Sequence, residues 1–195
     1  NASSCDQVIE VVDTGSPVVM LTGSPLLAPV GSSVSFSAAF DDDCGAPHDA
    51  TWNFGDGSAP VAASRVSSPA ASSHAYAVQG IYVVTATVTD DCGNAGSDNV
   101  VVVVYDPSAG FTTGGGWFVP DAESFIDGIN VTDTVSKANF GFVVKYKQGA
   151  SNPDGHLEFQ YKSGDINLKS TDMDWMVVQS ATKVRFKGLA TINNS

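Results

Sequence analysis

Short runs of alternating hydrophobic and polar residues follow one another along most of the chain. In Ser33–Phe40 the apolar side chains fall on every second position, and Ile81–Thr89 repeats the same period. This alternation predicts half-buried β-strands. Val100–Val104 is an unbroken valine run, typical of a strand covered on both sides or of a central sandwich strand. Turn residues separate these short strands, so the first half predicts a β-sandwich.

The second half continues the pattern with short connections. Phe140–Tyr146 and Leu157–Tyr161 alternate clearly, and the turn-forming sequences 152–155 and 162–165 follow them. Consecutive strands with short turns predict an antiparallel meander, and hence a second antiparallel β domain, either an open barrel or a sandwich. The three glycines at 114–116 predict a flexible turn or a close backbone approach, because no helix or phosphate-binding lysine follows them.

The charge of the chain is unevenly distributed. The 195 residues carry a net charge of −12, of which residues 1–107 contribute −11 and the remainder −1. This contrast favours two domains. We expect the boundaries to be a tail at 1–14, a sandwich at 15–106, a linker at 107–110 and a β domain at 111–195. The tail resembles the strand near residues 98–106, as the last strand of a preceding repeat would, and we expect the C-terminus to be truncated.

The net charge also limits the function. Nucleic acids and anionic membranes are bound mainly through clustered Lys and Arg, so neither is an expected partner. No apolar run approaches the ~20 residues that cross a bilayer, so we expect no transmembrane segment in this fragment.

Two of the three cysteines occur in the same tetrapeptide, Asp-Asp-Cys-Gly, at Cys44 and Cys92. The chain has no Cys-x-x-Cys motif, which argues against zinc. We therefore predict a disulfide between Cys44 and Cys92, with two buried free thiols as the alternative. A disulfide would place the protein in an oxidising compartment outside the cytoplasm. Cys5 is left without a partner in this fragment.

Residues 52–58, Trp-Asn-Phe-Gly-Asp-Gly-Ser, resemble the signature of the polycystic kidney disease (PKD) domain. The later His-x-Tyr, Gly-x-Tyr and Val-Thr-Asp sequences agree with the same family, and Asn53 departs from it. The resemblance covers about residues 15–106 and implies an immunoglobulin-like sandwich used outside the cell for protein or carbohydrate contact or for spacing. The signature positions, which we expect to be structural, are Trp52, Phe54, Gly55, Asp56, Gly57, His74 and Tyr76.

The second half resembles a bacterial domain that often follows PKD modules in surface proteins. The similarity lies in Phe140–Lys147, in Leu157–Gln160, and in Asp174-Trp175 together with Lys187-Gly188. The resemblance implies a bacterial protein that is secreted or displayed on the cell surface. It does not imply any particular enzymatic activity.

Aspartates gather at one predicted end of the sandwich. Carboxylate oxygens are ligands that Ca²⁺ prefers, and some PKD domains bind calcium with carboxylates in these loops. The alternative is a solvated acidic end. The candidate calcium ligands are Asp41, Asp42, Asp43, Asp90 and Asp91.

Support for catalysis is weak. The chain has three histidines and no Gly-x-Ser-x-Gly elbow. We expect His74 to have a structural role. For His48 we expect an exposed side chain, with a further loop ligand as the alternative. Trp117 and Trp175 are candidates for stacking on sugar rings, although alternation with polar residues favours the core for most aromatic side chains.

The sequence thus predicts a non-catalytic, monomeric structural or adhesive module of a larger bacterial surface or secreted protein. Its expected partner is a protein or polysaccharide at the cell surface. The alternative is a carbohydrate-binding accessory module of a secreted hydrolase, which predicts two or more exposed aromatic side chains on one face.

Overall fold

The structure is a computed structural model that describes residues 13–45, 47–120, 136–147 and 150–193. The described residues form strands joined by turns, with one short 3-10 helix, η1 (Lys162–Gly164), and no α-helix. The predicted all-β class is therefore confirmed. The chain divides into two compact units. The first comprises the residues up to Ala28, Ser32–Tyr76 and Tyr82–Val102; the second comprises Pro29–Gly31, Ala77–Ile81 and Val103–Ser195.

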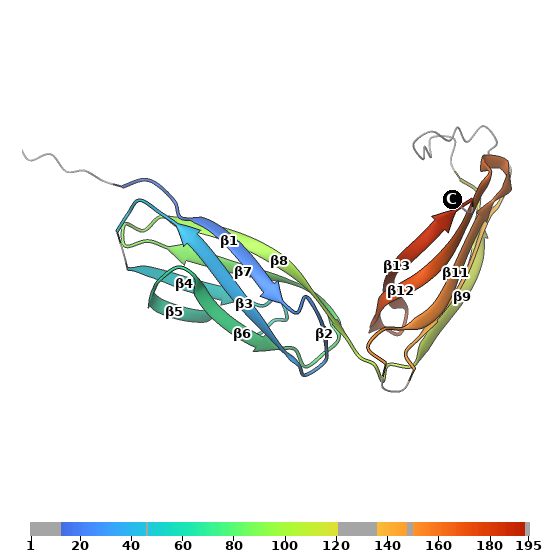
Figure 1. Cartoon of the computed structure of the whole chain (residues 1–195), viewed down its shortest axis with the longest axis horizontal. Helices are drawn as coiled ribbons and strands as arrows, with labels where there is room; N and C mark the ends of the chain where they lie inside the picture. The colour runs from blue at the N-terminus through green and yellow to red at the C-terminus, as the bar shows by residue number, and fades with distance from the viewer. Residues whose placement is uncertain (1–12, 46, 121–135, 148–149, 194–195) are drawn as a thin grey trace, which may run out of the picture. The chain divides into compact units, whose positions relative to one another are not determined.

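Two sheets build the sandwich of the first unit (Figure 1). The three-stranded sheet has the order β1 (Val18–Ser24), β3 (Ser33–Asp41), β6 (Ala70–Ala75). The five-stranded sheet has the order β2 (Leu27–Pro29), β8 (Ala95–Tyr105), β7 (Gly80–Thr89), β4 (His48–Asn53), β5 (Val61–Val66).

Aromatic side chains join these two sheets. The ring of Phe36 on β3 lies 6.4 Å from that of Trp52 on β4 and 5.7 Å from that of Phe54, measured between centroids. All three side chains are buried, as the alternation predicted. Burying one such side chain contributes about 1.5–3 kcal/mol, so this cluster is a main source of stability for the sandwich.

The valine run lies in β8, between β2 and β7. Val102 and Val104 are buried, whereas Val101 is exposed. The run is therefore a central sandwich strand, and the alternative of a strand covered on both sides was wrong.

The second unit contains one curved five-stranded sheet (Figure 1), and its strands pair in sequence order as an antiparallel meander, as predicted. The strands are β9 (Phe111–Phe118), β10 (Ala138–Lys145), β11 (Asp154–Tyr161), β12 (Ile166–Ser180) and β13 (Lys183–Ile192). Register shifts interrupt the pairing of β12 with β13 at three places. Extra residues at such places bend a strand and increase its twist.

The two faces of this sheet differ in character. The inner face buries Ala138, Tyr161 and Ile166 in one cluster, against which Phe159 packs. The outer face carries the alternate residues, most of them polar and exposed. This difference agrees with the period of two along each strand.

The three glycines at 114–116 lie inside β9 rather than in a turn. A Cβ atom at Gly114 would come within 2.7 Å of the ring of Phe142, and one at Gly116 within 3.3 Å of the ring of Phe140. The glycines thus let two phenylalanine rings from β10 lie across β9. Of the two alternatives, close approach holds and the flexible turn does not.

Candidate functional site

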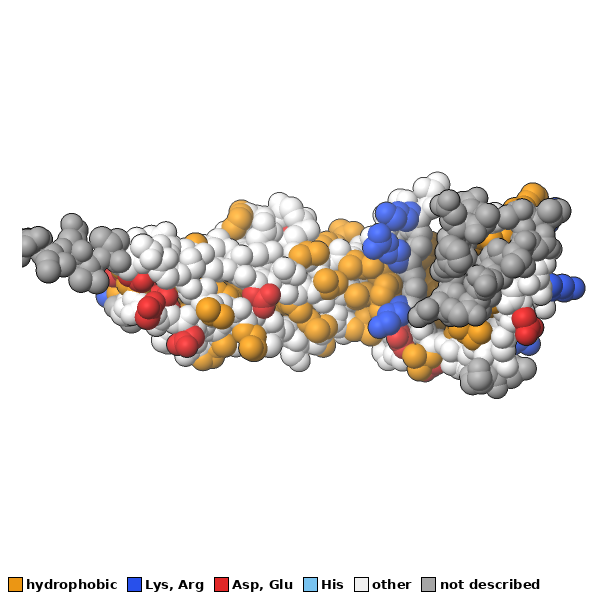
Figure 2. Space-filling view, turned by 90° about the horizontal axis from the view of Figure 1, so that it is seen from above, with side chains coloured by type: hydrophobic (Ala, Val, Ile, Leu, Met, Phe, Trp, Pro, Cys, Tyr) orange, Lys and Arg blue, Asp and Glu red, His pale blue; other side chains and the backbone are white. Residues whose placement is uncertain are grey.

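Three aspartates and a cysteine meet at one end of the sandwich. Asp13 precedes β1, Asp42 and Cys44 follow β3, and Asp90 follows β7. One ligand atom from each lies within 4.8 Å of those of the other three. Figure 2 shows acidic side chains, in red, gathered towards one end of this unit. The cluster therefore combines residues that are far apart in the sequence.

Two carboxylate oxygens of this cluster lack partners. Oδ2 of Asp13 and Oδ1 of Asp42 are buried and accept no hydrogen bond from the described residues. The side chain of Asp42 is only 2 % exposed, and its other oxygen lies 2.9 Å from Nε2 of His48. Buried carboxylate oxygens without partners cost free energy, and neighbouring like charges add to that cost. A cation between them would offset both terms.

Asp90 is held in place by the loop that follows it. Its two carboxylate oxygens accept hydrogen bonds from the backbone N–H and the side-chain amide of Asn94, at 2.8 and 2.9 Å. Burial opposes ionisation of Asp90, but these bonds and those from the backbone of Cys92 and Gly93 outweigh it and lower the pKa of the carboxyl group. Asp90 is thus a fixed negative charge at the cluster.

The three carboxylates of the cluster are ligands that a hard divalent cation such as Ca²⁺ prefers, whereas the thiol of Cys44 is not. Among the predicted ligands, the structure brings Asp42 and Asp90 together. Asp41, Asp43 and Asp91 are exposed and do not belong to the cluster. Asp13 completes the set, although it lies in the segment predicted to be a tail. His48 is buried beside Asp42, so the expectation that it is exposed was wrong.

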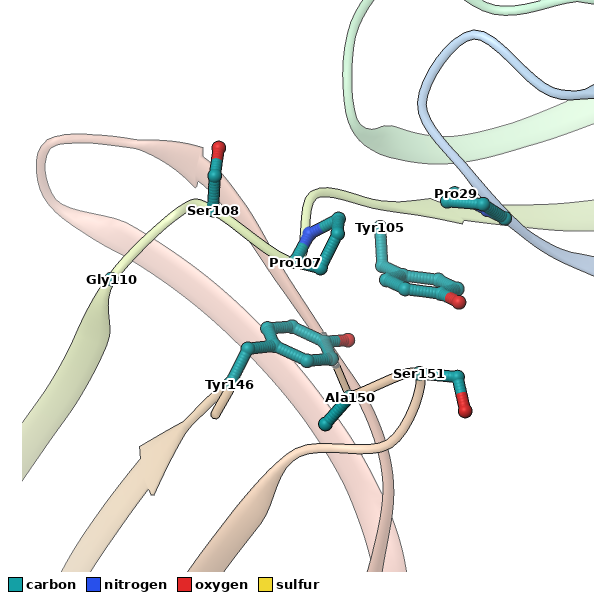
Figure 3. Close-up of a pocket in the computed structure, with 8 residues that line it drawn as sticks. All are labelled: Pro29, Tyr105, Pro107, Ser108, Gly110, Tyr146, Ala150 and Ser151. Carbon is teal, nitrogen blue, oxygen red and sulfur yellow. The ribbon is translucent and has the colours of Figure 1, made fainter. Parts of the chain in front are cut away.

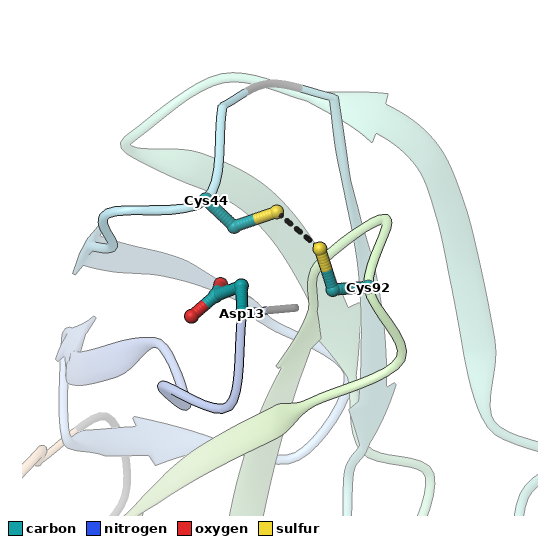
Figure 4. Close-up of side chains that lie close together, drawn as sticks. All are labelled: Asp13, Cys44 and Cys92. Atoms are coloured by element: carbon teal, nitrogen blue, oxygen red, sulfur yellow. Dashed lines mark hydrogen bonds between the residues drawn. The ribbon is translucent and has the colours of Figure 1, made fainter. Parts of the chain in front are cut away.

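The predicted disulfide partners lie side by side (Figure 4). The Sγ atoms of Cys44 and Cys92 are 2.8 Å apart, and both thiols are free in the structure. The hydrogen bond with Cys92, together with burial and the charges of Asp90 and Asp13, raises the pKa of the Cys44 thiol to about 12. The proximity agrees with the predicted pairing, and the disulfide itself stays a prediction.

The signature residues form a hydrogen-bonded turn at the end of β4. Gly55 has φ +75°, and a Cβ atom there would come within 2.4 Å of the carbonyl oxygen of Val83, so only glycine fits. Asp56 accepts hydrogen bonds from the backbone N–H and hydroxyl of Ser58, and its Oδ2 lies 2.7 Å from Nε2 of His74. The carboxylate therefore ties the turn to β6.

Aromatic contacts complete this turn. His74 stacks on Phe54 with ring centroids 4.1 Å apart and planes 5° apart, and the buried hydroxyl of Tyr76 donates to the carbonyl oxygen of Phe54. Burial raises the pKa of Tyr76, so it remains a donor over the ordinary pH range. These contacts hold the turn together, and the structural role that the resemblance implies for the signature positions stays a prediction.

The two candidate stacking residues differ in exposure. Trp117 on β9 is 58 % exposed, and the ammonium group of Lys137 lies 3.7 Å from the centroid of its indole. Trp175 is half-buried on β12, opposite Lys187. Phe111 is 68 % exposed and lies on the same outer face as Trp117, six residues earlier on the same strand. Two aromatic side chains of β9 are therefore available to a ligand.

Other tyrosines of the second unit are structural. Tyr161 is buried in the inner core. The hydroxyl of Tyr146 donates to the carbonyl oxygen of Met176 and accepts from its N–H, at 3.1 and 3.0 Å. Tyr146 also lines a cavity of about 520 Å³, and no Asp, Glu, His, Lys or Cys among the described residues lines it. Figure 3 shows the side chains of its lining. The eight lining residues are Pro29, Tyr105, Pro107, Ser108, Gly110, Tyr146, Ala150 and Ser151.

Each of the three histidines lies beside a carboxylate: His48 beside Asp42, His74 beside Asp56, and His156 beside Glu158. None of these pairs lines the cavity of Tyr146. Among the described residues, no helix is long and apolar enough to cross a bilayer.

Comparison with known proteins identifies a family for the first part of the chain. Residues 14–104 match the family model of the PKD domain. The PKD1 domain of Vibrio anguillarum Epp is 28 % identical over 49 % of this chain and 100 % of that domain, with a TM-score of 0.38. The PKD domain of the human VPS10 domain-containing receptor SorCS2 is 18 % identical over 56 % of this chain and 98 % of that domain, with a TM-score of 0.38.

A structure of carbohydrate-binding modules from the β-sandwich superfamily is 20 % identical over 75 % of this chain and 59 % of that one, with a TM-score of 0.40. The search of curated proteins found no match. PKD domains are typically non-catalytic modules of extracellular or surface proteins. The resemblance seen in the sequence is confirmed by the family model: residues 14–104 are a PKD domain with an immunoglobulin-like fold.

Proposed function

We propose that the chain is a non-catalytic, extracellular structural or adhesive module of a larger bacterial surface or secreted protein. The PKD domain acts as a spacer, and the second unit makes contact with carbohydrate or protein. The observation that carries the contact role is the exposure of Trp117, because a large aromatic side chain left in water on a folded surface is a common feature of binding sites.

In this proposal the acidic end of the PKD domain holds the loops of the sandwich rigid. Asp13, Asp42 and Asp90 hold a calcium ion, which joins the segment before β1 to the loops after β3 and β7. The disulfide between Cys44 and Cys92 links the same two loops covalently. A spacer benefits from such links because they restrict the loops, and loops are ordinarily the most mobile parts of a sandwich.

The second candidate function is that of a carbohydrate-binding accessory module of a secreted hydrolase. It is favoured by the two exposed aromatic side chains on one face, Phe111 and Trp117. Aromatic side chains stack on the apolar faces of sugar rings, whereas a pure spacer gains nothing from exposing them.

Binding measurements on the full chain test the contact role. The chain is exposed to immobilised bacterial cell-wall material, a panel of polysaccharides and a panel of extracellular proteins, and retention is compared with that of Trp117→Ala and Trp175→Ala. We expect Trp117→Ala to reduce retention strongly and the half-buried Trp175→Ala to reduce it less. Failure of the wild-type chain to bind any panel member would contradict the contact role and leave only the spacer.

A further inference from the structure

Four polar or aromatic side chains form one row across the outer face of the second unit. Trp117, Asn139, Gln160 and Asn167 are successive cross-strand partners on β9, β10, β11 and β12. Neighbouring strands lie about 4.8 Å apart, so the row extends over roughly 14 Å. This length exceeds a single sugar ring and suits a chain of several.

The three amides of this row have free hydrogen-bonding capacity. The side chains of Gln160 and Asn167 make no hydrogen bond to the described residues, and that of Asn139 makes one long bond of 3.4 Å to the carbonyl oxygen of Lys137. An amide donates through its NH₂ group and accepts through its oxygen. A sugar hydroxyl also does both, so a line of amides complements a line of hydroxyls.

Glycines leave space beside the row. Gly115 lies two residues before Trp117 on β9, and its partner on β10 is Gly141, two residues after Asn139. This glycine pair therefore lies on the same face as the row, directly beside it. No side chain rises from this pair, and nothing lies within 4 Å of a Cβ atom built at Gly141. The exposed indole of Trp117 therefore borders an open, flat floor on which a flat ring can rest. Lys137 contacts the indole and orients it by a cation–π interaction.

Charge distinguishes this row from its neighbours. The next charged side chain on the face, Glu158, already lies 3.2 Å from His156 and 3.6 Å from Lys169. The row at the far end of the sheet pairs Phe111 with Lys145 and Lys145 with Asp154. Apart from Lys137, whose ammonium group lies over the indole of Trp117, the charged groups named on this face lie outside the row and several of them neutralise each other. This arrangement favours an uncharged ligand.

We propose that the row Trp117–Asn139–Gln160–Asn167 binds a neutral, hydroxyl-rich polysaccharide that runs across the strands. One sugar ring stacks on Trp117 over the glycine floor, and the three amides form hydrogen bonds with hydroxyls of the following sugars. The inference rests on the contact role proposed above and names its ligand class and its residues.

Native electrophoresis of the full chain through gels that contain a soluble polysaccharide measures this binding. The neutral probes are dextran, laminarin, galactomannan and hydroxyethylcellulose, and the anionic probes are alginate and polygalacturonate. The variants are Trp117→Ala, Gln160→Ala and Asn167→Ala. His156→Ala is the matched control, because His156 is exposed on the same strand and the same face as Gln160 but outside the row. Thermal unfolding confirms that each variant is folded.

We expect retardation by at least one neutral polysaccharide, an affinity loss of about tenfold or more in Trp117→Ala and Gln160→Ala, and almost none in His156→Ala. If all three row variants still bind a neutral polysaccharide as tightly as the wild-type chain, the assigned residues are wrong, although the proposed contact with carbohydrate stands. Binding to anionic probes alone overturns the ligand class. If no polysaccharide binds but a protein of the panel above does, the inference is wrong and the contact role survives in its protein form.

Discussion

Oδ2 of Asp42 lies 2.9 Å from Nε2 of His48, and both side chains are almost completely buried. This contact uses one oxygen of the carboxylate and leaves Oδ1 buried without a hydrogen bond from the described residues. Asp13 and Asp90 place two more carboxylates within reach. Such an arrangement is costly in the absence of a positive charge, and it is stabilised by a cation that binds the folded state alone.

Calcium is therefore expected to raise the melting temperature of the PKD domain. At a concentration one hundred times Kd, a ligand that binds only the folded state adds about 2.7 kcal/mol to the free energy of unfolding. For a domain of this size, this corresponds to an increase in Tm of roughly 10 °C or more. Differential scanning calorimetry with millimolar CaCl₂ measures the shift, and MgCl₂ should produce a smaller one, because Mg²⁺ demands a stricter octahedral geometry.

Matched variants identify the ligands. Asp42→Asn removes a ligand charge from the cluster and should abolish the calcium-dependent shift, whereas Asp41→Asn changes an exposed neighbour outside it and should leave the shift intact. An equal shift in both variants, or none in the wild-type chain, would show that the cluster is only a solvated acidic end.

Oxidation of Cys44 and Cys92 to a disulfide is expected to stabilise the same unit. The two residues are 48 positions apart in the chain, and closing a loop of this length stabilises the folded state by about 4 kcal/mol in the chain-entropy model. We expect Cys44→Ser and Cys92→Ser to lower the free energy of unfolding by a similar amount in oxidising buffer, measured by urea denaturation.

Reduction is the control for the cysteine variants. In the presence of a reducing agent, the wild-type chain and the two serine variants should unfold at similar urea concentrations. Titration of thiols in the unfolded, oxidised wild-type chain should find only that of Cys5. Three reactive thiols under these conditions would contradict the pairing.

Periodicity predicted the strands whose inward positions carry large side chains. Phe36 on β3 and Val84 on β7 are buried as expected. It did not predict β5 and β6, in which eight of the twelve residues are Ala or Ser. These residues give little contrast between an inner and an outer face, and alanine has a low preference for strands. Their place in the sheets depends on pairing with β4 and β3, which is a property of the whole fold.

The acidic site was predicted in part for a similar reason. The loops that bear Asp42 and Asp90 could be placed together because each follows a strand at the same end of the sandwich. Asp13 precedes the first strand, and only the three-dimensional course of the chain brings it beside them. A local signal existed: Asp13 accepts a hydrogen bond from the backbone N–H of Gly15, the pattern of an Asx turn, which fixes the direction of its side chain.

The outer-face row of the second unit was also visible only in part. Trp117 was a candidate because of its residue type, whereas Asn139, Gln160 and Asn167 carry no motif. Their alignment depends on the register of four strands. A shift of one residue would move each side chain to the other face, and no local sequence pattern encodes the register of strands joined by longer connections.

Replacing Gly114 by alanine is expected to destabilise the second unit. The new Cβ atom would lie 2.7 Å from the ring of Phe142, so the ring or the backbone of β9 must shift. Overpacking of this kind typically costs about 1–3 kcal/mol. Gly141→Ala is the control, because nothing lies within 4 Å of a Cβ atom at that position. Urea denaturation should show a lower midpoint for the first variant alone; equal midpoints would contradict the role assigned to the glycines.

The carboxylate of Asp56 should make the stability of the PKD domain depend on pH in acid. Burial opposes its ionisation, but hydrogen bonds from Ser58 and the contact with His74 outweigh this effect and lower the pKa from 3.8 to about 2. A group whose pKa is lower in the folded state stabilises that state above its unfolded pKa, and the contribution disappears as the pH falls through the folded pKa. The relevant interval is thus about pH 4 to pH 2.

Asp56→Asn tests this dependence, because the amide keeps the size of the side chain and removes its charge. The difference in free energy of unfolding between the wild-type chain and this variant should shrink as the pH falls from about 4 towards 2. Urea denaturation across this range measures it, and carbon NMR titration of the Asp56 carboxyl group should give a midpoint close to 2. Asp91→Asn, at an exposed position, is the control and should show little difference at any pH. The opposite result would be a titration midpoint near 3.8 for Asp56, together with a difference in free energy of unfolding between wild type and Asp56→Asn that does not change in acid. It would mean that the contacts with Ser58 and His74 do not stabilise the charged form.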